Sequence, residues 1–179
     1  MTEIKCEIIS SELITPEDKK LFDQISDLAF RDDEKDPELR SVEWSPQMDW
    51  MGLGRLGEEL VTILGLLKRE ILVGKRTILV YGIGGVATHP NWQKQGFSSA
   101  LLNKAAQFML ENKEATFGLL ICAEERRSFY GLAGWKYVAD ALFYFQSGNK
   151  RKLKSVVMVL PILEQNWPQG EIDLCGLPW

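Results

Sequence analysis

The sequence predicts an α/β (α+β) fold, with a mixed central sheet of about six to seven strands flanked by about four helices. Short β-prone runs alternate with segments whose apolar residues recur at helical spacing. Glycine turns separate three successive runs in the middle of the chain, which is typical of an antiparallel meander. The last of these runs passes through a loop into a helix between Tyr81 and Leu102.

The composition is ordinary for a globular protein. With 179 residues, 45% of them hydrophobic and 26% charged, residues 1–179 are predicted to form a single domain with a sizeable core. The net charge of -4 argues against a general nucleic-acid binder, which usually carries a basic excess. No apolar run approaches the roughly 20 residues that span a bilayer, and the N-terminus lacks an apolar secretory core. These features predict a cytoplasmic protein that binds neither nucleic acid nor membrane.

The first predicted elements are a strand and a helix. The run Lys5–Ser10 is rich in β-prone residues. Thr15 is a good N-cap and Pro16 suits the first helical position, so a helix is predicted from there to about Phe30.

An acidic segment follows at residues 32–43, where six acidic residues stand against two basic ones. It is predicted to be a loop or a frayed helix. Its charge suits either a solvated surface or a rim that attracts a cationic substrate.

Three antiparallel strands come next. The runs at 48–55 and 59–71 flank a turn at Gly57, and a second turn at Gly74 leads into a run at 77–88. A helix is then predicted to end near Asn112.

The last third of the chain alternates strands with one short helix. The continuous apolar run at 116–122 is typical of a buried central strand. A short helix at 124–132 is closed by Gly134, and strands are predicted at 135–138, 141–145 and 155–160. The basic run at 150–154 is expected to be a solvated turn, and the aromatic tail to pack on the domain.

The cysteines give no sign of a metal site. Cys6, Cys122 and Cys175 stand far apart, without the CxxC spacing of zinc ligands or the density of a disulfide framework. They are expected to be free, buried thiols.

The strand, loop and helix between Tyr81 and Leu102 predict an anion site. Backbone N–H groups at a helix N-terminus have no intrahelical acceptor, and they commonly bind phosphate. The loop consists of Gln93, Lys94, Gln95, Gly96, Phe97 and Ser98.

This loop has the form Gln/Arg-x-x-Gly-x-Gly/Ala, with Ser98 as a departure at its last place, and residues 129–135 (FYGLAGW) follow it. Together with the order of elements, these patterns resemble the Gcn5-related N-acetyltransferases. The resemblance implies acetyl-CoA as the cofactor. The N–H groups of Gln95, Gly96, Phe97 and Ser98 would then cradle the pyrophosphate, with Gln93 and Lys94 as further donors.

The same resemblance gives roles to the strand that precedes the loop. The main chain of Val86, Ala87 and Thr88 would hold the pantetheine arm as an added strand would, and the Val86 N–H would face the thioester carbonyl. A splay between this strand and the run at 116–122 would admit the cofactor.

A closer resemblance is to the aminoglycoside 2'-N-acetyltransferases. It rests on residues 87–102, on residues 157–161 (VMVLP), on the pair Glu43–Trp44 and on the final tryptophan. The sequence departs from those enzymes at Gly84, where they carry a glutamate, and at Leu177, Lys152 and Lys154, where they carry acids. The central segment also shows a distant likeness to the nodulation N-acyltransferases.

The resemblance makes Tyr130 the candidate general acid for the departing thiolate; the other interpretation is a core tyrosine with a satisfied hydroxyl. A lysine-like ammonium has a pKa of about 10.4, so a neutral nucleophile needs a base. The candidates, in descending order, are Glu43, Asp49, the carboxylate of Trp179, and His89, which otherwise is a turn residue before Pro90.

Three glycines of the central strand, Gly82, Gly84 and Gly85, offer no base, and they leave space in which a bulkier substrate is expected to fit. The leading hypothesis is an acetyl-CoA-dependent N-acetyltransferase acting on a primary amine of a small molecule, such as an aminoglycoside-like amino sugar. The alternatives are an acyl-CoA-binding module with lost catalysis and an N-acyltransferase with a longer acyl donor. A homodimer is left open.

Overall fold

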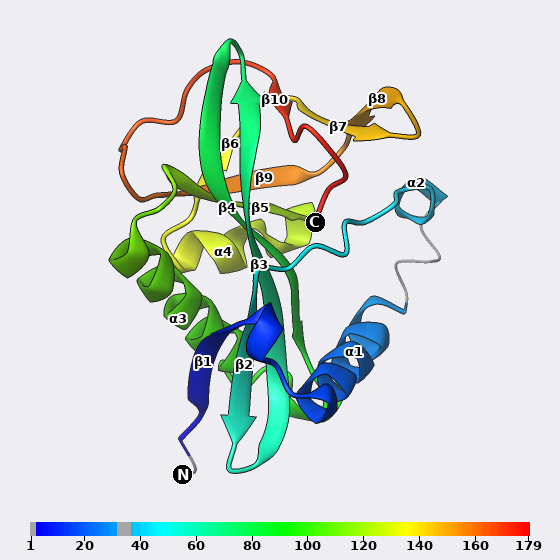
Figure 1. Ribbon diagram of the computed structural model, residues 1–179, viewed down its shortest axis with the longest axis vertical. Helices are drawn as coiled ribbons and strands as arrows, with labels where there is room; N and C mark the ends of the chain where they lie inside the picture. The colour runs from blue at the N-terminus through cyan, green and yellow to red at the C-terminus, as the bar shows by residue number, and fades with distance from the viewer. Residues whose placement is uncertain (1–2, 32–36) are drawn as a thin grey trace. The chain divides into compact units, whose positions relative to one another are not determined.

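The computed structural model describes residues 3–31 and 37–179, which form a mixed α+β fold (Figure 1). The helices and strands are β1 (Lys5–Ser10), α1 (Pro16–Phe30), α2 (Pro37–Arg40), β2 (Trp50–Leu56), β3 (Glu59–Val73), β4 (Arg76–Thr88), α3 (Phe97–Asn112), β5 (Phe117–Cys122), α4 (Arg127–Leu132), β6 (Lys136–Val138), β7 (Leu142–Gln146), β8 (Asn149–Leu153), β9 (Val156–Pro161) and β10 (Ile172–Asp173). Short 3-10 turns are η1 (Ser11–Leu13), η3 (Pro90–Trp92) and η4 (Glu124–Arg126).

The strands belong to one mixed sheet in the order β6-β9-β5-β4-β3-β10-β7-β8, with β2 pairing with β3 and β1 with β2. The fold class is as predicted, but the described residues form ten strands, more than the expected six to seven. The chain divides into two compact units. Unit 1 comprises Met1–Val42, Met48–Leu66 and Gly84–Phe108, and unit 2 comprises Glu43–Gln47, Leu67–Ile83 and Met109–Trp179. The expectation of a single domain stays a prediction.

In unit 1, β1 and β2 lie side by side and antiparallel, and β2 continues into the hairpin with β3 (Figure 1). Gly57 takes a φ of 61° in this turn, which confirms the predicted hairpin. Helix α1 begins as predicted, because the Thr15 hydroxyl accepts a hydrogen bond from the Asp18 N–H at 3.1 Å.

Two helices cover opposite faces of this part of the sheet. Phe22 and Ile25 of α1 pack in a cluster with Met51 of β2. Trp50, which precedes Met51 in β2, contacts Phe108 of α3 with ring centroids 5.4 Å apart. Because successive strand residues point to opposite faces, α1 and α3 lie on the two sides of β2.

In unit 2, β5 is a central strand, as its apolar run predicted. It pairs in parallel with β4 from Val80↔Phe117 to Ile83↔Leu120 and antiparallel with β9. Phe117 and Leu119 are fully buried. Helix α4 comes after β5 in the chain. It is followed by Gly134, whose φ of 87° agrees with the predicted end of the helix.

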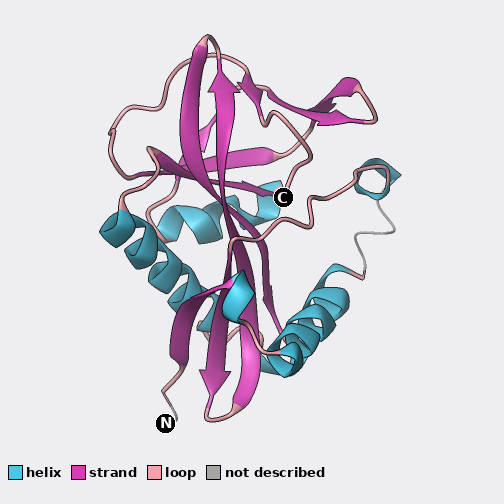
Figure 2. Ribbon diagram, viewed as in Figure 1, coloured by secondary structure: helices cyan, strands magenta, loops and turns pink. Residues whose placement is uncertain are grey.

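Two expectations for the C-terminal part and the cysteines are wrong. The basic run is not a turn: it forms β8, which pairs with β7, and the turn lies at Ser147 and Gly148 (Figure 2). Charged side chains suit a strand at the edge of a sheet, because they keep its free edge from pairing. The cysteines are free, but Cys175 is exposed and the other two are only half-buried.

Every helix within residues 3–31 and 37–179 is too short or too polar to cross a bilayer.

Candidate functional site

The predicted phosphate loop, in unit 1, has the backbone that an anion site needs. The Gly96 carbonyl accepts the first α3 hydrogen bond, from the Ala100 N–H at 3.0 Å. The N–H groups between these two residues therefore precede any intrahelical acceptor. Gly96 has a φ of 83°, and a Cβ on it would meet no atom within 4 Å. The helix start is thus open to an approaching anion.

A chain of hydroxyl groups ties this helix start to the end of β4. Ser98 Oγ donates to Thr88 Oγ1 at 2.6 Å, since the Thr88 hydroxyl itself donates to Thr62 Oγ1 at 2.9 Å. Thr62 Oγ1 in turn donates to the Ala87 carbonyl at 2.8 Å. Thr62 is fully buried and Thr88 is 7% exposed, so the network is shielded from water. It fixes the loop relative to the strand.

Sequence reasoning missed this network. The motif gives Ser98 a role through its N–H and treats its side chain as a small-residue departure from Gly/Ala, whereas its hydroxyl anchors the helix to β4. The available signal was Thr62, a lone polar residue within the apolar run of β3. A buried threonine in such a run requires a hydrogen-bond partner nearby.

Other loop side chains also brace the turn. Gln93 Nε2 donates to the Thr88 carbonyl at 3.2 Å, so this predicted phosphate donor also holds the loop to the strand. His89 Nδ1 accepts from the Asn91 N–H at 3.3 Å, which favours the turn interpretation of this histidine. The exposed Lys94 adopts a φ of 62°, a left-handed conformation next to the glycine.

The strand before the loop is interrupted by Gly85, whose φ is 60°. A left-handed glycine inside a strand is typical of a β-bulge, which disturbs the ladder and re-aims the residues that follow. Ala87 packs in the core cluster, while Val86 is half-buried. Because side chains alternate, Val86 and Thr88 share the opposite face from Ala87.

The space expected at the central glycines is filled at Gly82, which is a correction. In unit 2, a Cβ on Gly82 would lie 2.5 Å from Nε1 and 2.8 Å from Cζ2 of Trp179. The Arg69 guanidinium stacks over this indole at 5.0 Å and donates to the Leu177 carbonyl at 2.6 Å. The tail is therefore packed, and Gly82 is small because a tryptophan ring occupies the place of a side chain.

Tyr130, also in unit 2, has a buried side chain. It is 8% exposed and contacts Phe129 edge-on at 5.0 Å. Burial raises the pKa of Tyr130 to about 12; the Cys122 thiolate charge adds to the rise and Arg126 opposes it. Burial likewise raises the pKa of Cys122 to about 11. Both groups are protonated at neutral pH, so the tyrosine can act as a hydrogen-bond donor.

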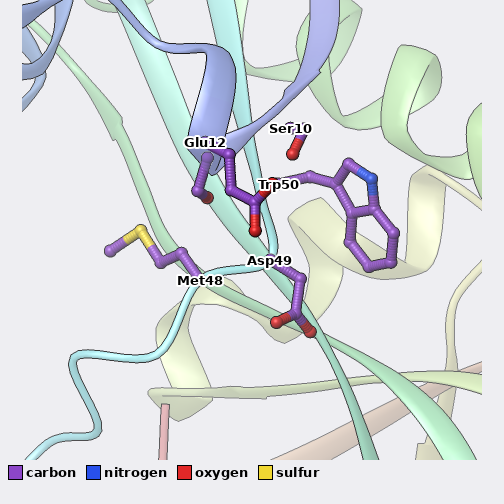
Figure 3. Close-up of a pocket in the computed structure, with 6 residues that line it drawn as sticks. Ser10, Glu12, Met48, Asp49 and Trp50 are labelled. Atoms are coloured by element: carbon purple, nitrogen blue, oxygen red, sulfur yellow. The ribbon is translucent and has the colours of Figure 1, made fainter.

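The candidate bases lie in different settings. The Glu43 side chain is exposed, and its backbone N–H donates to Gln146 Oε1 at 3.0 Å. Ser45, two residues later, is held to the C-terminal segment, because its N–H donates to the Pro178 carbonyl at 2.7 Å. Asp49 lies in unit 1, where it lines a cavity of about 310 Å³ (Figure 3). Among the described residues, no group of three or more potential metal-ligating side chains is present.

Comparison with known families decides the class of protein. The Acetyltransferase (GNAT) domain family matches residues 11–138, which is most of the chain. The chain belongs to the GNAT acetyltransferases. No curated protein matches its sequence.

Solved structures share the fold of this GNAT domain at low identity. ElaA of Escherichia coli is 16% identical over 88% of this chain and 99% of that chain, with a TM-score of 0.65. A GNAT family acetyltransferase from Brucella melitensis, solved in complex with acetyl-CoA, is 17% identical over 94% of both chains, with a TM-score of 0.59. FeeM, an N-acyl amino acid synthase from uncultured soil microbes, is 11% identical over 90% of this chain and 92% of that chain, with a TM-score of 0.59.

Proposed function

We propose that this GNAT domain is an N-acetyltransferase that transfers the acetyl group of acetyl-CoA to a primary amine of a small molecule. The observation that carries the proposal is the open, left-handed Gly96 at the start of α3, anchored through Ser98 to the end of β4. The N–H groups of such an exposed helix start point outward, and the helix dipole favours negative charge there, which suits a phosphate ligand. The complex of the Brucella melitensis relative with acetyl-CoA supports the choice of cofactor.

The residues of unit 1 would bind the donor. The N–H groups of Gln95, Gly96, Phe97 and Ser98 would hold the pyrophosphate, with Lys94 adding positive charge. The main chain of Val86 and Thr88 would bind the pantetheine amides, and the Val86 N–H would polarise the thioester carbonyl. Acetyl-CoA, when bound, supplies the acetyl group on an activated thioester.

Tyr130 would stabilise the departing sulfur. A phenol with a pKa of about 12 stays protonated at neutral pH, so it donates a hydrogen bond. A thiolate with a reference pKa of about 8.5 is too weak a base to remove that proton completely. The tyrosine would therefore stabilise the sulfur by hydrogen bonding, and the proton that balances the reaction would come from the acceptor nitrogen.

The narrower proposal is an aminoglycoside-like amino sugar as acceptor. Its support is the resemblance around residues 87–102 and the packed C-terminal tryptophan. Gly84 stands where such enzymes carry a glutamate, so Glu43, Asp49 or the carboxylate of Trp179 would have to take up the proton of the amine.

The test is CoA release from acetyl-CoA in the presence of a broad amine panel that includes aminoglycosides. Wild-type protein is expected to release CoA with at least one amine, and Tyr130→Phe to lower kcat by about 10²-fold or more. Tyr137→Phe is the matched control, because it removes a half-exposed hydroxyl from β6. No release with any amine, or equal kcat values for the two variants, would contradict the catalytic assignment.

Gly84 favours a second candidate, an acyl-CoA-binding module that has lost catalysis, because this place carries no base. Such a module would be stabilised by acetyl-CoA without turnover. Replacing acetyl-CoA by long-chain acyl-CoA in the same assay would detect an N-acyltransferase with a longer donor.

A further inference from the structure

The segment Glu43–Gln47 of unit 2 has no helix or strand, yet other parts of that unit hold it by hydrogen bonds. The Glu43 N–H donates to Gln146 Oε1 of β7 at 3.0 Å. The Ser45 N–H donates to the Pro178 carbonyl at 2.7 Å, and Figure 1 shows the end of the chain beside this segment. Contacts between residues far apart in sequence therefore determine its course.

Arg69 of β3 joins this segment to the C-terminal one. Its guanidinium donates to Ser45 Oγ at 3.3 Å and to Gln47 Oε1 at 3.4 Å. It also donates to the Leu177 carbonyl at 2.6 Å and stacks over the Trp179 indole at 5.0 Å. A guanidinium has five donors in a rigid plane, so one side chain can fix several acceptors at once. A lysine ammonium, which is a point charge on a flexible stem, cannot reproduce this geometry.

Burial does not account for this anchoring. Four of the five side chains in the segment are exposed, namely those of Glu43, Trp44, Pro46 and Gln47. Gln146, by contrast, is 7% exposed and directs a buried amide oxygen to the segment's backbone. A catalytic group on an irregular segment needs such support, because a displacement of about 1 Å can lower the rate about 10²-fold.

The proposed acceptor amine must lose a proton before it can attack. At pH 7 an amine with a pKa of about 10.4 is neutral in only about one molecule in 2,500. A carboxylate next to the bound ammonium can take up that proton. Glu43 and Trp179 are the candidates that share unit 2 with Tyr130. The exposed side chain of Glu43 is open to a substrate, whereas Trp179 is 8% exposed.

We propose that Arg69 and Gln146 are positioning residues, and that they hold Glu43 as the proton acceptor for the amine that is acetylated. This inference rests on the proposed function and deepens it. The bound ammonium loses one proton through Glu43 to water, and the lone pair left on nitrogen forms the N–C bond. The thioester C–S bond breaks, and the second proton that nitrogen loses leaves with the sulfur as the thiol of CoA.

The first test is a double-mutant cycle in the CoA-release assay. The acceptor is the amine of the panel that releases CoA fastest, with kanamycin and 1-aminobutane as first choices. Glu43→Gln is expected to lower kcat at pH 7 by about 10²-fold, and Arg69→Lys by about tenfold. Because Arg69 acts through Glu43, Arg69→Lys should cause no further loss in the Glu43→Gln background. Arg76→Lys is the matched control, since this guanidinium of unit 2 is exposed and bonds to Glu164, and it should leave kcat unchanged.

The pH profile distinguishes a proton acceptor from a purely structural contact. In Glu43→Gln, kcat/KM should rise about tenfold per pH unit from pH 7 to 9, because only the neutral amine reacts. The wild-type value should rise less steeply, and Arg69→Lys and Gln146→Leu should fall between the two. Amide hydrogen exchange of residues 43–47 checks the anchoring without an acceptor. It should be faster in Arg69→Lys and Gln146→Leu, and unchanged in Arg76→Lys, with melting temperatures that show all three variants to be folded.

The proposal is overturned if Arg69→Lys lowers kcat by the same factor in the wild-type and Glu43→Gln backgrounds. It is also overturned if Arg69→Lys and Gln146→Leu leave the exchange of residues 43–47 unchanged. Faster exchange in these variants, with no amine acetylated by the wild-type protein, would support the anchoring of Glu43. That result would contradict the proposed function, on which the role of Glu43 as proton acceptor depends.

Discussion

The glycines of β4 have different structural roles. Gly82, Gly84 and Gly85 look equivalent in sequence, and together they predict empty space beside the strand. The Trp179 indole fills the place next to Gly82, whereas Gly85 faces open space and is needed for its left-handed backbone. No local pattern distinguishes these two cases, because the ring at Gly82 comes from a residue 97 positions later in the chain.

Gly82→Ala tests the close contact with Trp179. The added methyl group would overlap the indole, so we expect a loss of about 1–3 kcal/mol in the free energy of unfolding, as for other overpacked sites. Gly131→Ala is the control, because nothing lies within 4 Å of its Cβ and helix α4 favours alanine. Urea unfolding of the three proteins checks this; equal stability of Gly82→Ala and wild type would contradict the packing.

The raised pKa of Tyr130 predicts a pH effect on stability. The folded state keeps the proton to about pH 12, whereas the unfolded chain releases it above pH 10, its ordinary pKa. The stabilisation is therefore complete below pH 10 and is lost as the pH rises from 10 to 12, by about 1.4 kcal/mol at pH 11.

Tyr130→Phe lacks this ionisation, so its stability should rise relative to wild type by about that amount between pH 9 and pH 11. The difference between the two proteins, measured by urea unfolding, cancels the other titrating groups. A difference that does not change with pH would show that the hydroxyl is not buried in solution.

At the scale of elements, the end of β4 and the start of α3 act as one unit because of the buried hydroxyl chain. Thr62→Val keeps the shape but removes the donor to the Ala87 carbonyl and the acceptor of the Thr88 hydroxyl. We expect a loss of about 1–3 kcal/mol in stability and weaker binding of acetyl-CoA, since the loop loses its anchor. Thr77→Val, on an exposed part of β4, is the control. Calorimetry with acetyl-CoA and urea unfolding separate the two effects.

Local chemistry determines which elements the sequence can predict. Thr15 caps α1 with its own side chain, and Gly57 and Gly134 stop their elements with left-handed backbones. These signals lie within a few residues of the feature they cause. Strand β10 has two residues and exists because β3 and β7 pair with it, so no pattern in its own sequence predicts it. β8 is hidden for the same reason: its pairing with β7 outweighs its basic composition.

The features of the candidate site also differ in whether a local sequence pattern can predict them. The predicted phosphate loop rests on a short motif, because the free N–H groups of a helix start are a local feature of the backbone. The hydroxyl chain from Thr62 to Ser98 joins residues 36 positions apart in sequence, and the cavity that Asp49 lines joins η1 to β2. Such constellations depend on strand register, which a single sequence does not determine.

At the scale of the whole molecule, acetyl-CoA bound at one loop must raise the free energy of unfolding of the chain, because it binds only the folded state. At acetyl-CoA concentrations about 100 times Kd, linkage adds about 2.7 kcal/mol, which for a chain of this size raises the melting temperature by about 5–10 °C. Gly96→Ala should abolish most of this shift, because alanine in a left-handed conformation costs about 1–2 kcal/mol and distorts the loop.

The matched control is Gly57→Ala. Gly57 is also left-handed and also has an open Cβ position, but it lies in the turn between β2 and β3. Both variants should lower the melting temperature of the free protein by a similar amount, since both carry the same strain. Only Gly96→Ala should lose the response to acetyl-CoA. If both variants keep the response, the anion site is not at the start of α3; if both lose it, the response reflects global stability and the loop has no special part in binding.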